Sequence, residues 1–148
     1  MRNLSYAMIA IGALGLSACA TLEEGAVETT SDTYNANLTG SAEVGGGAPQ
    51  GMGRAEISLS DELGQICYEL KDVTGIGPIT AAHIHRGAAG TNGDVVFPLN
   101  RSNQGEYQGC SDASQSLQDG IAANPSMYYV NVHTSQYPDG AIRGQLMR

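Results

Sequence analysis

The feature that most constrains the fold of this chain is a series of short segments in which apolar and polar residues alternate. In residues 34–38, for example, Tyr34, Ala36 and Leu38 share one face, as is typical of a strand with one buried side. About eight such runs recur at a spacing of roughly 8–12 residues, and many of the chain's 20 glycines separate them. This pattern predicts an all-β chain, an antiparallel Greek-key-like β-sandwich or barrel of about eight strands.

Two segments depart from the alternation. Residues 95–97 form a short continuous apolar run, which is typical of a strand buried on both faces. Residues 114–123 predict the one short helix, with Leu117, Ile121 and Ala122 on its apolar side. The fold class is therefore all-β with a single helix.

Three glycines follow the strand predicted around residue 84, at Gly87, Gly90 and Gly93. We expect them to serve turns that need a positive φ, which glycine adopts at no steric cost. Their spacing does not indicate a phosphate-binding loop, because no lysine follows and the segment does not lead into a helix.

The N-terminal segment is typical of an export signal. A basic residue, Arg2, precedes an almost wholly apolar run over residues 4–16, which is shorter than the about 20 residues that span a bilayer. The next residues, Leu16-Ser17-Ala18-Cys19, resemble the lipobox of bacterial lipoproteins. That resemblance implies cleavage before Cys19, acylation of this cysteine and, because Ala20 follows it, sorting to the outer membrane of the cell envelope. The alternative is an ordinary secretory signal in which Cys19 is incidental.

The chain is thus expected to have three parts. Residues 1–18 are a lipoprotein signal peptide, residues 19–33 a polar, acidic and flexible tether, and residues 34–148 the β-domain. The formal net charge of −8 argues against nucleic acid and anionic lipid headgroups as partners. Membrane attachment is then expected through the lipid anchor alone.

The cysteine count agrees with export. With Cys19 spent on lipid, Cys67 and Cys110 remain as an even pair. An even pair in an oxidising compartment predicts a disulfide. Two free buried thiols are the alternative.

The domain resembles the CHRD family, which is named after chordin and is common in bacterial exported proteins. The resemblance covers about residues 34–147, and three motifs in order carry it: His83-Ile84-His85-Arg86-Gly87, Val130-Asn131-Val132-His133-Thr134 and Ile142-Arg143-Gly144-Gln145. It implies an all-β sandwich somewhat like the copper–zinc superoxide dismutase barrel. It implies no set of catalytic residues.

All three histidines of the chain lie within these motifs. Strand periodicity puts His83 and His85 on the face opposite Ile84, and puts His133 on the face opposite Val132. If their strands are neighbours, three imidazoles meet as ligands that suit copper(II) or zinc(II). The ring nitrogens should then lie within roughly 3–4 Å of each other. The alternative is a scaffold in which each imidazole donates a hydrogen bond that fixes a loop.

Arg143 also faces away from the predicted core. We expect it to bridge a carboxylate within the sheet, the alternative being that it binds an anionic ligand.

Three functions are compatible with these residues. The first prediction is a cell-envelope lipoprotein whose CHRD-like domain is a non-enzymatic binding or scaffold module for a protein or polysaccharide. The second is a copper- or zinc-binding protein that uses His83, His85 and His133. The third is a metal-dependent redox enzyme of the superoxide dismutase type. No Ser–His–Asp order or paired-carboxylate motif indicates a hydrolase, so no catalytic residue is assigned.

Overall fold

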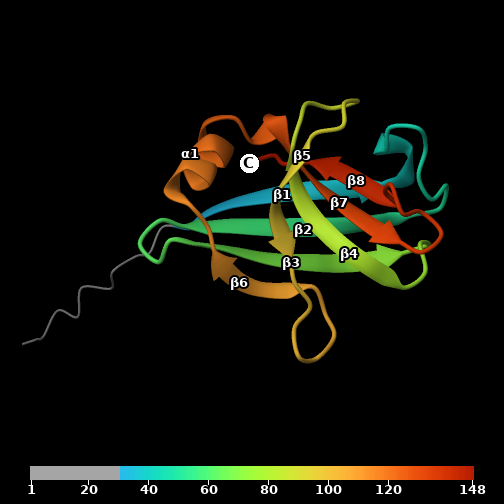
Figure 1. Cartoon of the computed structure of the whole chain (residues 1–148), viewed down its shortest axis with the longest axis horizontal. Helices are drawn as coiled ribbons and strands as arrows, with labels where there is room; N and C mark the ends of the chain where they lie inside the picture. Colours follow the sequence, from blue (N-terminus) through green and yellow to red (C-terminus); the bar gives the residue numbers. More distant parts are fainter. Residues whose placement is uncertain (1–30) are drawn as a thin grey trace, which may run out of the picture.

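A computed structural model describes residues 31–148 of the chain, which form eight strands and one α-helix (Figure 1). The expected signal peptide, Cys19 and nearly all of the expected tether lie outside the described residues. The strands are β1 (Asp32–Thr39), β2 (Met52–Ser60), β3 (Gln65–Thr74), β4 (Ile79–Arg86), β5 (Asp94–Leu99), β6 (Gln108–Asp112), β7 (Tyr128–Thr134) and β8 (Ile142–Gln145). The helix α1 spans Gln115–Ala123, and single 3₁₀ turns lie at Gly40–Ala42 and Pro125–Met127.

All eight strands belong to one antiparallel sheet that curls into a nearly closed barrel or sandwich. Their order is β5-β4-β7-β8-β1-β2-β3-β6, so β5 and β6 are its edges. β1, β2 and β3 follow one another as a meander, whereas β4 pairs with β7 across a long stretch of sequence. The predicted fold class is confirmed. Within the described residues, no helix is both long and apolar enough to cross a membrane.

The alternation that predicted the strands also fills the core. Tyr34, Ile57 and Tyr68 are register partners on β1, β2 and β3, and all three are buried. The apolar run at residues 95–97 behaves differently from the prediction, because β5 is an edge strand. Phe97 is buried there, but Val95 is 52% exposed.

The helix begins one residue later than predicted, because Ser114 is its N-cap. The Ser114 hydroxyl accepts a hydrogen bond from the backbone N–H of Leu117, which satisfies one of the unpaired donors of the first turn. Ile121 is fully buried, as expected, whereas Ala122 is exposed. Gln118 is buried instead, and its amide donates to the Ala113 carbonyl.

The glycines after β4 do not all serve the expected purpose. Only Gly90 has a positive φ, of 76°, so the expectation was wrong for Gly87 and Gly93. A Cβ on Gly93 would lie 1.7 Å from the carbonyl oxygen of Arg86. Gly93 is therefore required by the close approach of two backbone segments, not by its φ.

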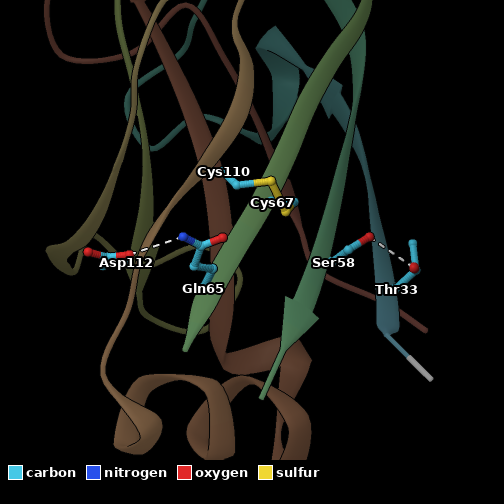
Figure 2. Close-up of a disulfide and its surroundings, with 6 residues drawn as sticks. All are labelled: Thr33, Ser58, Gln65, Cys67, Cys110 and Asp112. Atoms are coloured by element: carbon cyan, nitrogen blue, oxygen red, sulfur yellow. Dashed lines mark hydrogen bonds between the residues drawn. A yellow bond between two sulfur atoms is a disulfide. The ribbon is translucent and has the colours of Figure 1, made fainter. Parts of the chain in front are cut away.

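Cys67 and Cys110 form the predicted disulfide, which joins β3 to the edge strand β6 (Figure 2). The two cysteines are direct register partners in this strand pair. Gln65 and Asp112, which are also register partners, share a hydrogen bond of 3.2 Å. The disulfide thus holds an edge strand that has only one neighbour in the sheet.

Replacing both cysteines, as Cys67→Ser with Cys110→Ser, should lower the free energy of unfolding by about 3–4 kcal/mol. The bond closes a sequence separation of 43 residues, and its loss returns the entropy of that loop to the unfolded chain. Urea unfolding measures the change, and wild-type protein under reducing conditions should match the double variant. A loss below about 1 kcal/mol would contradict this role for the bond.

Candidate metal centre

Strand pairing gathers the three histidines of the chain on one patch of the sheet. The register of β4 with β7 sets His133 opposite Ala81, two residues before His83. Because side chains alternate along a strand, His83, His85 and His133 all lie on the face opposite fully buried Ile84. The two strands that carry the histidines, β4 and β7, are therefore neighbours, which is the condition under which we expected the three imidazoles to meet.

The distances between the imidazoles fall close to those that one ion requires. Nδ1 of His83 lies 3.2 Å from Nε2 of His133, within the range of roughly 3–4 Å expected for two ligands of one ion. The ligand atoms of all three residues, His85 included, lie within 4.8 Å of one another. A shared ion therefore requires only small shifts of the rings.

Backbone carbonyls orient two of the three rings. Nδ1 of His85 lies 2.9 Å from the carbonyl oxygen of Gly93, and Nδ1 of His133 lies 2.9 Å from that of Pro138. A carbonyl oxygen only accepts, so each Nδ1 carries the hydrogen. In the neutral ring, Nε2 then keeps its lone pair, which is the form that binds a metal. Nε2 of His85 is buried and has no hydrogen-bond partner among the described residues.

The surroundings favour neutral imidazoles. Burial lowers the pKa of His83, and the neighbouring His133 and His85 lower it further. Burial is also the main cause that lowers the pKa of His85; its bond to the Gly93 carbonyl acts in the opposite direction. Both rings are consequently kept available as ligands at neutral pH.

Tyr129, on the neighbouring strand β7, and Arg143, one strand further on β8, support His85. The rings of His85 and Tyr129 are stacked, with centroids 4.8 Å apart and an interplanar angle of 7°. The guanidinium carbon of Arg143 lies 3.4 Å from the centroid of Tyr129. The Tyr129 hydroxyl accepts a hydrogen bond from the backbone N–H of Gly93, the same residue whose carbonyl binds His85. The sheet and the loop after β4 therefore both hold the His85 ring in position.

Simple alternation suggested that the face carrying these polar residues is open to solvent. In the structure this face is covered. Tyr129, Asn131 and Arg143 do lie on the face opposite the apolar core, yet they are 1%, 3% and 1% exposed. Arg143 donates hydrogen bonds to the carbonyl oxygens of Ala88 and Thr91 and to the side chain of Asn92. The loop after β4 thus covers this part of the sheet.

Arg143 does not form the carboxylate bridge that we expected. Among the described residues, its hydrogen bonds reach only neutral oxygens, and no carboxylate lies within ion-pair distance of it. Glu43 instead interacts with Arg143 at longer range. The role of Arg143 in the structure is to hold the loop.

Glu43 is a buried acid that the sequence did not single out. Its Oε2 accepts from the amide of Asn131 at 3.3 Å, whereas its Oε1 and the Oδ1 of Asn131 have no partner in the described residues. Burial raises its pKa to about 7, against the opposing effects of Arg143 and Asn131. A protonated Glu43 can donate, so it can satisfy an oxygen that a carboxylate leaves unpaired. Its only signal in the sequence is its place beside the glycine-rich segment 45–47.

Glu43→Gln should stabilise the domain at pH 8 relative to wild type and leave it nearly unchanged at pH 4.5. The pKa of Glu43 is raised from 4.5 to about 7 by folding, so its stabilising contribution is complete below pH 4.5 and is lost as the pH rises through 7. The loss should be about 1–3 kcal/mol, less than the whole pKa shift implies because solvent screens part of the effect. Urea unfolding at pH 4.5, 6 and 8, with a chelator present, measures it.

The matched control is Glu62→Gln, which makes the same charge change at an exposed position. An equal pH dependence of stability in wild type and Glu43→Gln would show that Glu43 does not titrate in this way.

Comparison with known proteins agrees with the resemblance expected from the three motifs. The family model of the CHRD domain matches residues 34–146. No curated protein and no solved structure matches the chain. The matched span contains the three histidines, the disulfide and Arg143, and it covers most of the chain. This protein therefore belongs to the CHRD domain family.

Proposed function

We propose that this CHRD domain binds a divalent transition-metal ion through His83, His85 and His133. The observation that carries the proposal is the buried Nε2 of His85, which lacks a hydrogen-bond partner within a cluster of three imidazoles. Leaving a buried polar atom unsatisfied costs roughly 1–3 kcal/mol. A metal ion shared with His83 and His133 would use this lone pair.

A purely structural role accounts for fewer of these contacts. Hydrogen bonds to the carbonyls of Gly93 and Pro138 explain Nδ1 of His85 and of His133. A direct hydrogen bond between His83 and His133 explains the 3.2 Å contact. Neither explains why Nε2 of His85 is buried beside them. A bound metal would also account for the hydrogen bonds of His85 and His133 to backbone carbonyls, since metal-bound histidines usually donate their other ring N–H to such an acceptor.

The donor set favours copper(II), followed by zinc(II). The cluster consists of three imidazoles, without a thiolate or carboxylate among its described members. Imidazole suits both ions, and three histidines with an open position are a known zinc arrangement. At equal geometry, copper(II) binds nitrogen ligands more tightly than zinc(II). Binding alone needs no further residue, so the proposed module is non-enzymatic.

We also propose that the domain works in the cell envelope, attached by lipid at Cys19 to the outer membrane. The apolar segment 4–16 and the sequence Leu16-Ser17-Ala18-Cys19 support this proposal. The Cys67–Cys110 disulfide agrees with an oxidising compartment outside the cytoplasm. An acyl anchor would keep the metal site near the membrane surface without any contact between lipid and the domain itself.

The double variant His83→Ala/His85→Ala should lose at least about 100-fold in copper(II) affinity, because it removes two of three ligands. Isothermal titration of the full-length chain in detergent, with copper(II) and then zinc(II), measures the affinity. Urea unfolding of both proteins in chelator separates loss of ligands from loss of fold. Unchanged metal binding in a folded double variant would exclude this site.

Cys19→Ala should lose the acyl groups that wild type carries after expression in a bacterium with two membranes, because it removes the residue to which they are attached. Intact mass spectrometry measures this and should show acyl groups on wild type alone. Partition into detergent is not the readout, because without cleavage before residue 19 the apolar segment 4–16 stays attached to the variant. The control, Cys67→Ser/Cys110→Ser, removes the other two cysteines of the chain and should keep its acyl groups. Acyl groups on Cys19→Ala, or none on wild type, would contradict lipidation at this residue.

A further inference from the structure

A pocket opens beside the histidine cluster. It has a volume of about 270 Å³, and both His83 and Arg101 line it. The backbone of the pocket comes from β4 and from the end of β5, where His83 and Pro98 are register partners. One of the three proposed metal ligands therefore shares a cavity with a guanidinium group.

The charge of Arg101 is not neutralised within the described part of the chain. Its Nε donates to the carbonyl of Gly105 at 3.0 Å, and its guanidinium carbon lies 5.6 Å from the centroid of Tyr107. None of the salt bridges in residues 31–148 involves Arg101. These two contacts position the guanidinium without cancelling its charge.

The donor set of the metal site leaves both charge and coordination incomplete. Three neutral imidazoles do not reduce the charge of a divalent ion, and they fill only three positions of a four-coordinate site. The bound ion would be the largest local charge. Asp94 is the carboxylate whose charge reaches the cluster, where it acts on His85. With the ion bound, the local balance is positive although the chain as a whole carries a formal charge of −8.

We infer that the open position on the metal binds a small anion, which Arg101 attracts through the pocket it shares with His83. This inference rests on the proposed metal function and names the class of ligand for the same site. An anion bound there completes the coordination and also gains from the nearby guanidinium charge.

Azide is the probe for this inference, because its binding to copper(II) produces a charge-transfer absorption band in visible light. Full-length protein in detergent is loaded with one equivalent of copper(II) and titrated with azide at low ionic strength. Arg101→Gln should weaken azide binding about fivefold, as expected for one charge interaction near the surface, and added salt should reduce the difference. Arg101→Lys should restore part of the affinity.

The matched control is Arg148→Gln, which removes the same charge where Arg148 pairs with Asp32 at the start of β1. It should leave the azide affinity unchanged. Copper(II) affinity should be equal in all four proteins, since Arg101 is not a ligand.

The outcomes separate this inference from the function on which it rests. Absence of copper binding in wild type would overturn both. Normal copper binding with no azide band, or with equal azide affinity in wild type and Arg101→Gln, would overturn the anion site alone. A copper affinity that falls in Arg101→Gln would also overturn it, by showing that Arg101 supports the fold of the site instead.

Discussion

The arrangement of the site depends on one buried cation, the guanidinium of Arg143. Only 1% of this residue is exposed, yet no ion pair compensates its charge in the described part of the chain. Hydrogen bonds to Ala88, Thr91 and Asn92 and the face of Tyr129 replace the water that it loses. These contacts hold the loop after β4 against the sheet, and that loop contains the carbonyl that orients His85.

A second constraint comes from the backbone of the same loop. Gly93 passes so close to Arg86 that a side chain on Gly93 would collide with the Arg86 carbonyl. Its N–H binds the hydroxyl of Tyr129 and its carbonyl binds Nδ1 of His85. Gly93, which has no side chain, therefore sets the direction of the His85 side chain eight residues earlier.

The sequence predicted which side of a strand each side chain takes, but it did not predict which loops cover the sheet. Alternation put His83 and His85 opposite Ile84, and this holds because a strand repeats every two residues. That β4 lies beside β7 did not follow from alternation, since 50 residues separate His83 from His133. The burial of Arg143 and Glu43 did not follow either. Both are covered by loops, whose paths depend on contacts between distant parts of the chain and carry no periodic signal.

Arg143 also links the structural and chemical properties of the site. Its positive charge makes a second positive charge on His85 unfavourable, and it therefore contributes to the lowered pKa of His85. The same charge opposes the effect of burial on Glu43. The residue that fixes His85 in place thus also favours its neutral form, and it lowers the pKa of Glu43, which burial nevertheless keeps at about 7. The proposed metal binding would give this buried charge a second use beside holding the loop: an apolar residue there could fill space, but it could neither anchor three loop oxygens nor disfavour protonation of His85.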